Sequence, residues 1–210
     1  ESADAQRAIF DEYQQLENLQ VVKPTEVEDW EEIRKKDPKA RLVRGAMLIV
    51  QKNIEDEIRR KWKGRFVALG DKLRDVTGRI IREKLKHFAP SSMAAFRLGF
   101  FWELVTGGIS IKGDTPGAHL IPWLSGPATY MEFDEETLPA HWRTEKSKKC
   151  RRPVRRAWKS CYGLQRAQTD WGRHCRKILL SKGCEPIYDY GEESIFLYSP
   201  SKERLPTLVI

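Results

Sequence analysis

Apolar residues recur at helical spacing in several stretches of this chain. In residues 3–19 the positions Ala5, Ile9, Tyr13 and Leu16 share one face, which predicts an amphipathic helix. The same spacing predicts a short helix at 27–36, a core helix at 89–105 and an amphipathic helix at 167–183.

Shorter stretches rich in Val, Ile, Leu and aromatic residues predict strands. Residues 40–52 and 61–73 are two basic strands with a charged connection, so we expect a long hairpin. Further strands are predicted at 107–111, 128–133, 194–199 and 207–210, with the last two paired to each other. This order of helices and strands indicates an α+β fold with a mixed or antiparallel sheet and packed helices. A length of 210 residues suits one large domain or two small lobes.

Charge is the most uneven feature of the composition. The chain is 40% hydrophobic and 32% charged, with a net charge of +8. Residues 143–159 hold nine lysines and arginines against one glutamate, so the remainder is close to neutral. Such a block suits a polyanion such as nucleic acid, and nearby Trp158 and Tyr162 are able to stack on bases. A solvated linker or exposed face is the alternative. The candidate nucleic-acid contacts are Lys148, Lys149, Arg151, Arg152, Arg155, Arg156, Trp158 and Lys159.

Other classes of protein receive less support. The four cysteines have no C-x-x-C spacing, so buried free thiols are favoured over a zinc site that uses His174, Cys175 and Cys184. The longest apolar run, residues 98–111, is too short to span a bilayer. No N-terminal apolar stretch resembles a signal peptide. We therefore expect no membrane partner and an intracellular location, in a cytoplasmic particle or in the nucleus.

Asp114 admits two interpretations. It lies in the stretch GISIKGDTPGAHL, residues 108–120, next to Thr115, Pro116 and Gly117. Aspartate beside proline and glycine is common in turns. A carboxylate at the end of a strand is also a ligand that Mg²⁺ prefers.

Several motifs together resemble the reverse transcriptase domain of copia-type long-terminal-repeat retrotransposons. KWKGRFVALG resembles the family's K-A-R-L-V-A-R-G, and KHFAPSSMAAFRL resembles T-F-A-P-V followed by an arginine, here Arg97. IKGDTPGAHL resembles L-D-V-x-x-A-F-L, Tyr130-Met131 stands for Y-M, and CYGLQRAQTDW resembles L-Y-G-L-K-Q-A-P-R-x-W. LLSKGCEPIYDYGEESIFLY is similar to the motifs that follow. The resemblance covers nearly all of residues 1–210.

The resemblance implies a polymerase right-hand fold, with fingers at about 1–90 and part of the palm at about 91–210. It also implies RNA-templated DNA synthesis on an RNA or DNA template–primer with deoxynucleoside triphosphates. Two Mg²⁺ or Mn²⁺ ions, roughly 3.5–4 Å apart, would steady the reacting oxygens. Asp114 would be the catalytic ligand, at the end of the 107–111 strand and near residues 207–210, and the carbonyl of Thr115 would be a second ligand. The implied nucleotide-binding residues are Lys63, Arg65, His119, Gln165 and Arg166.

The departures from the family pattern bear on activity. His119 stands where the family has an aromatic residue that blocks the ribose 2′-hydroxyl, and Arg166 replaces a glutamine that holds template and base. The 210 residues contain no Tyr-x-Asp-Asp, which we interpret as a domain truncated before its second catalytic motif or one that has lost it. One aspartate does not hold two metals, so these residues alone should not extend a primer. A degenerate polymerase fold that binds nucleic acid without catalysis, and an unrelated α+β protein with chance matches, remain as alternatives.

Overall fold

The computed structural model describes residues 2–83, 92–109, 111, 113–187, 195–199 and 207–209. The chain divides into two compact units, Glu1–Leu85 with His119–Asp170, and Lys86–Ala118 with Trp171–Ile210. The predicted α+β class with a mixed sheet and several helices is confirmed. The functional division into fingers and palm near residue 90 stays a prediction.

The first unit is built on a five-stranded sheet. Its order is β1-β5-β4-β2-β3, with a parallel β2–β4 pair and antiparallel neighbours elsewhere. The strands are β1 (Val27–Asp29), β2 (Arg41–Lys52), β3 (Lys61–Ala68), β4 (Thr129–Glu132) and β5 (Pro153–Ala157).

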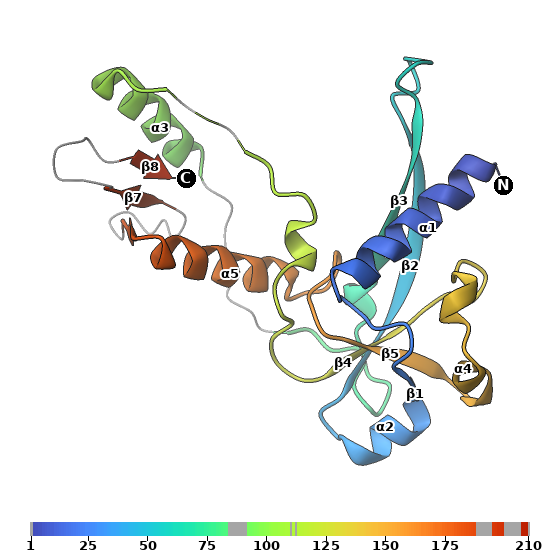
Figure 1. Cartoon of the computed structure of the whole chain (residues 1–210). Coiled ribbons are helices and arrows are strands. Elements are labelled where there is room, and N and C mark those ends of the chain that lie inside the picture. Colours follow the sequence, from blue (N-terminus) through green and yellow to red (C-terminus); the bar gives the residue numbers. More distant parts are fainter. Residues whose placement is uncertain are drawn as a thin grey trace. The chain divides into compact units, whose positions relative to one another are not determined.

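The long hairpin predicted from the two basic strands is confirmed. β2 and β3 pair antiparallel from Gly45 opposite Ala68 to Lys52 opposite Lys61. They extend beyond the rest of the sheet, with α1 (Ala3–Asn18) alongside (Figure 1). The second strand ends at Ala68 rather than at residue 73, because a short 3₁₀ helix, Gly70–Lys72, follows it.

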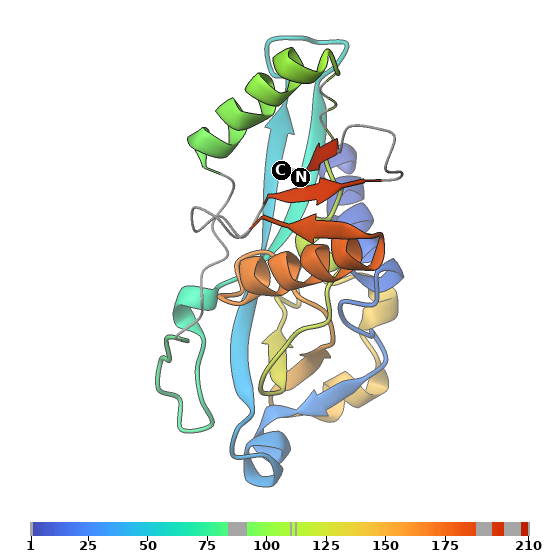
Figure 2. The same ribbon diagram turned by 90° about the vertical axis from the view of Figure 1, so that its left-hand side faces the viewer.

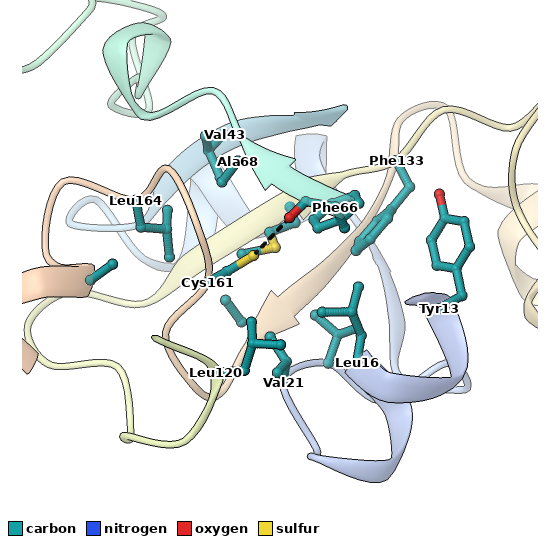
Figure 3. Close-up of a cluster of buried hydrophobic side chains, with 14 of the residues drawn as sticks. Tyr13, Leu16, Val21, Val43, Phe66, Ala68, Leu120, Phe133, Cys161 and Leu164 are labelled. Carbon is teal, nitrogen blue, oxygen red and sulfur yellow. Dashed lines mark hydrogen bonds between the residues drawn. The ribbon is translucent and has the colours of Figure 1, made fainter. Parts of the chain in front are cut away.

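Two predicted helices cover opposite faces of this sheet. Ser2 caps α1 and Asp29 caps α2 (Trp30–Lys36), each by accepting a backbone N–H bond. Side chains of α1 pack into the larger core with Val43, Met131 and Ala157 (Figure 3 shows part of it). On the other face α2 packs against the neighbouring strand positions Leu42, Tyr130 and Val154. Consecutive strand residues thus enter different cores, as the two-residue period requires.

The basic segment is more ordered than a cationic linker. It begins with α4 (Glu145–Lys149) and continues as β5, which lies between β1 and β4. The sequence pattern predicts no strand there, because four charged residues at 151–156 mask the buried Val154 and Ala157. Residues 27–29 were likewise assigned to a helix, whereas they form β1.

The second unit contains α3 (Met93–Thr106) and a three-stranded antiparallel sheet. Its strands are β6 (Cys184–Pro186), β7 (Phe196–Tyr198) and β8 (Thr207–Val209), so the predicted pairing of the two late strands is confirmed. α5 (Ala167–Ser181) begins in the first unit and continues in the second. No helix in the described part of the chain is long and apolar enough to cross a membrane.

Two expectations for the second unit are corrected. The core helix is a helix, but Phe96, Phe100 and Leu104 are 54%, 60% and 82% exposed. The predicted strand at 107–111 is absent from its described residues: Gly107 ends α3 in the left-handed region, and Ile109 and Ile111 are irregular and exposed. Because both isoleucine side chains stay in water, a strand at 107–111 would gain little free energy from burying apolar surface. Residues 89–91, 110, 194 and 210 of these predictions lie outside the described residues.

Glu12 ties α1 to the hairpin through a buried carboxylate. Its Oε1 accepts the Phe66 N–H at 2.9 Å, and the residue is 7% exposed. Burial raises the pKa of Glu12, against the Phe66 hydrogen bond and the charges of Lys63 and Arg65, which lower it. The folded state therefore holds this proton more tightly than the unfolded chain does.

This raised pKa predicts a pH dependence of stability. Below about pH 4.3, the usual pKa of glutamate, the carboxyl is protonated in both states and the folded state keeps its full stability. As the pH rises through the folded pKa, this contribution to the free energy of unfolding is progressively lost. Relative to Glu12→Gln, whose amide oxygen can still accept the Phe66 N–H, the wild-type free energy of unfolding should fall with rising pH. Urea unfolding at several pH values measures this difference. The exposed Glu32→Gln on α2 is the control, and a wild-type advantage that grows with pH would contradict the prediction.

Candidate nucleic-acid interface

One face of the β2–β3 hairpin carries exposed cationic side chains. Leu48 lies opposite Arg65, Val50 opposite Lys63, and Lys52 opposite Lys61, so these six residues share a face, here called the cationic hairpin face. The opposite face is covered by α1, because a Cβ atom at Gly64 would lie 2.5 Å from the Ala8 carbonyl oxygen. On the open face Leu48 and Val50 are 51% and 49% exposed.

At the root of this face a small aromatic cluster adjoins Arg65. The Arg65 guanidinium lies 5.1 Å from the centre of the Tyr162 ring. The centre of the His119 ring lies 5.5 Å from the centre of the same Tyr162 ring. His119 is half-buried, and burial lowers its pKa. At neutral pH this histidine is therefore an uncharged ring beside Tyr162, and Arg65 supplies the charge.

The backbone holds Tyr162 in this position. The Ala68 N–H donates to the Tyr162 carbonyl at 2.8 Å, which joins the turn at 162–163 to the end of β3. Gly163 has φ +83°, and a Cβ atom there would lie 2.0 Å from the Ala68 carbonyl oxygen. Only glycine combines this dihedral with so close an approach. The Tyr-Gly-Leu stretch is thus a turn seated on the hairpin.

Gln165 and Arg166 are engaged in internal contacts. The Gln165 amide donates to the carbonyls of Gly70 and Ile81, at 2.6 and 3.1 Å, and accepts the Glu83 N–H at 2.7 Å. Arg166 makes a two-pronged ion pair with Glu83 and donates to the Ser125 carbonyl. The Glu83 side chain is only 6% exposed. These two side chains tie residues 70–83 to the start of α5, and the nucleotide role expected of them stays a prediction.

Two cations of the basic segment are also used within the fold. Arg152 makes a two-pronged ion pair with Glu132, at 2.8 and 3.1 Å, and this partner raises its pKa. Arg155 is 2% exposed and donates to the carbonyls of Pro24 and Trp142. Burial lowers the pKa of Arg155 to about 10, which still leaves it charged at neutral pH. Its guanidinium is a core group, out of reach of a phosphate.

The remaining cations of this segment lie nearer to solvent. Lys148 pairs with Glu145 within α4 at 2.5 Å, whereas Lys149 and Arg151 are exposed. Arg156 lies over the Trp158 ring at 4.2 Å, and Lys159 lies over the Trp123 ring at 5.6 Å.

Asp114 and Thr115 lie in an irregular, exposed stretch of the second unit. The expectation that Asp114 ends a strand is therefore wrong for the described residues around it. The Thr115 carbonyl accepts the Ala118 N–H at 3.2 Å, as in an ordinary turn. Among residues that the structure describes, no group of three or more His, Cys, Asp and Glu side chains gathers to hold a metal. By itself this exposed aspartate supplies too few ligands for two metal ions.

All four cysteines are free thiols. Cys161 and Cys184 are buried, and Cys150 and Cys175 are partly buried, so the sequence expectation holds fully for two of them. Burial raises the pKa of Cys161 to about 12, which leaves this thiol protonated and unreactive.

No known protein family, curated protein or solved structure matches this chain.

The two environments of the basic segment predict contrasting mutants. Arg155→Ala should lower the free energy of unfolding by about 3 kcal/mol, because it removes the donor to the Pro24 carbonyl and one of two donors to the Trp142 carbonyl, and it empties a core position. Arg151→Ala removes the same charge from an exposed site and should change stability by less than about 0.5 kcal/mol. Urea unfolding of both variants checks this, and equal losses would show that Arg155 is not a core group.

The close approach of the turn at 162–163 to β3 predicts a second pair of contrasting mutants. Gly78→Ala should cost about 1–2 kcal/mol for its left-handed backbone alone, since nothing lies within 4 Å of a Cβ atom there. Gly163→Ala should cost clearly more, because the turn must also move away from the Ala68 carbonyl. Thermal or urea unfolding compares the two, and similar costs would mean that the contact with β3 is readily relaxed.

Proposed function

We propose that this chain binds nucleic acid, as the fingers and part of the palm of a copia-type reverse transcriptase with a polymerase right-hand fold. The observation that carries the proposal is the cationic hairpin face, with Arg65 packed on Tyr162 beside His119. In sequence these residues belong to three motifs with family resemblance, and in the fold they belong to one unit.

The chemistry of this face suits a nucleic-acid backbone. Its six residues include four cations and no acid. Lysine and arginine on an exposed strand neutralise phosphates without reading sequence, so affinity should depend steeply on salt. Leu48, Val50 and Tyr162 add apolar and aromatic surface for sugars and bases. We propose an RNA or DNA template–primer as the partner, within a cytoplasmic particle or the nucleus.

In the intact family enzyme, deoxynucleoside triphosphates and Mg²⁺ or Mn²⁺ would complete the site. Lys63, Arg65 and His119 are the residues we propose for the triphosphate, since they lie on or beside the cationic hairpin face. Asp114 is proposed as a metal ligand on its resemblance to the family motif alone. Hard oxygen ligands of this kind suit Mg²⁺.

A second candidate is a polymerase-like fold that holds nucleic acid without catalysis. The internal contacts of Gln165 and Arg166 favour it, because the family uses that region for template and base, whereas here both side chains stabilise the loop at 70–83. The two candidates differ in triphosphate binding. The first expects saturable binding of a deoxynucleoside triphosphate with Mg²⁺ that Lys63→Ala weakens, and the second expects none.

Salt dependence tests the nucleic-acid interface itself. If about five phosphates are neutralised, the log–log slope of affinity for a duplex should be roughly −3.5 to −4.5. Substituting Lys61, Lys63 and Arg65 by Ala should make that slope shallower by about 2–3. Fluorescence anisotropy with a labelled template–primer at several salt concentrations measures both values.

A matched variant controls for net charge. Arg34, Lys35 and Lys36 at the end of α2 are exposed, and their substitution by Ala removes the same three charges. α2 and the hairpin tip lie at opposite ends of β2 (Figure 2). This variant should keep most of the wild-type slope. Equal slopes in the two triple variants would reject the cationic hairpin face, and no wild-type binding would reject the function.

A further inference from the structure

Trp123 is a large aromatic residue held at the surface by a well-anchored backbone. The Ser160 N–H donates to the Pro122 carbonyl at 2.9 Å, and the Leu124 N–H donates to the Trp158 carbonyl at 3.0 Å. Trp123 and Lys159 thus form an isolated antiparallel bridge. Leu120, three residues earlier, is completely buried in the core. The backbone is fixed on both sides of the residue, yet Trp123 itself is 64% exposed.

Trp158, in the same region, is held by contacts with neighbouring side chains. Its indole N–H donates to Glu26 at 3.0 Å, and both Lys23 and Arg156 lie over its ring. Lys23 is also paired with Glu26 at 2.7 Å. Trp158 is half-buried and engaged by these contacts, whereas Trp123 is 64% exposed and therefore offers more of its ring to a base.

The charge around Trp123 is favourable for a nucleic acid. The Lys159 ammonium lies 5.6 Å from the centre of the Trp123 ring, on the backbone segment paired with it. Arg156 and Lys23 lie at the adjacent Trp158. An exposed indole with cations beside it matches the way proteins hold single strands, with bases on aromatic rings and phosphates near lysine and arginine.

The same pair of backbone segments connects this place to the proposed interface. Residues 119–124 run beside residues 158–162, with His119 next to Tyr162 at one end and Trp123 next to Lys159 at the other. Tyr162 follows Lys159 by three positions, which the backbone spans with at most about 10 Å. A single strand that contacts Tyr162 and Arg65 therefore reaches Trp123 within a few nucleotides.

We propose that Trp123 is a stacking platform for a base of single-stranded nucleic acid, with Lys159 contacting a neighbouring phosphate. The inference rests on the proposed nucleic-acid function and adds a second contact point to it. It also specifies the form of the ligand, because bases within a duplex do not offer a free face to an indole.

The test is anisotropy binding of a labelled oligothymidylate to the full chain at fixed salt. Trp123→Ala should weaken binding roughly 5- to 150-fold, the range for loss of one base stack. Trp123→Phe should retain most of the affinity because it keeps an aromatic face. Trp123→Ala should leave the salt slope nearly unchanged, whereas Lys159→Ala should make it shallower by about 0.7, the value for one phosphate of a single strand.

Two controls separate stacking from other causes. Phe10 is another exposed aromatic of the first unit, at 46% exposure, and Phe10→Ala should bind like the wild type. An oligomer of abasic sites has phosphates but no bases, so Trp123→Ala should bind it as well as the wild type does. Thermal unfolding verifies that each variant folds.

The outcomes distinguish this inference from the proposed function. If the wild type does not bind the oligothymidylate or the duplex, the nucleic-acid function itself fails. If the wild type binds and Trp123→Ala binds equally well, the stacking platform alone is overturned. An equal loss for Trp123→Ala and Phe10→Ala, or a loss with the abasic oligomer, would also reject it.

Discussion

The packing of Phe66 is the interaction on which the rest of the first unit depends. Its ring stacks on Phe133 at 4.9 Å between centres and lies 6.1 Å from Tyr13 of α1. It also fills the space over Gly45, where a Cβ atom would lie 2.0 Å from the ring. The Phe66 N–H donates to Glu12, and Cys161 Sγ lies 4.0 Å from its carbonyl oxygen (Figure 3). One residue of β3 thus contacts α1, β2, the residue that follows β4 and the residue that precedes Tyr162.

This arrangement explains how a long hairpin keeps one face open. α1 and the aromatic core take one face at the root of the hairpin, and a two-stranded ribbon without such support is marginal in water. The opposite face carries exposed lysine and arginine side chains, whose charged ends favour contact with water. The same burial that stabilises the hairpin therefore determines which of its side chains a ligand can meet.

Two groups of cationic side chains can be distinguished, one bonded within the fold and one lying near the surface. Arg152, Arg155 and Arg166 are held by a carboxylate or by backbone carbonyls within the fold. Removing a charge from water is costly, and fixed hydrogen bonds must offset that cost. Lys63, Arg65 and Lys159 lie at the surface or over an aromatic ring near it. Net charge alone does not separate these groups, because it counts a buried guanidinium and a solvated one equally.

The sequence by itself determined the elements whose apolar spacing is regular. The helices around Tyr13 and Trp171, and the β2–β3 hairpin, follow from local periodicity, because burial along one face needs only a local pattern. The α+β class follows from their order. Within the basic segment that periodicity is hidden, since Arg155 lies in a core position where an apolar residue is expected, and the segment was therefore not recognised as a strand.

Only the tertiary structure decided which charged and aromatic residues are free to act. Gln165 and Arg166, which the sequence assigns to a nucleotide, bond within the fold to residues about 80 to 95 positions away in the chain. Trp158, which the sequence assigns to base stacking, is engaged by Glu26 and two cations, whereas Trp123 is 64% exposed. Partners this distant leave no local pattern. Whether a side chain contacts solvent depends on the packing of the whole unit, which residue type and spacing do not encode.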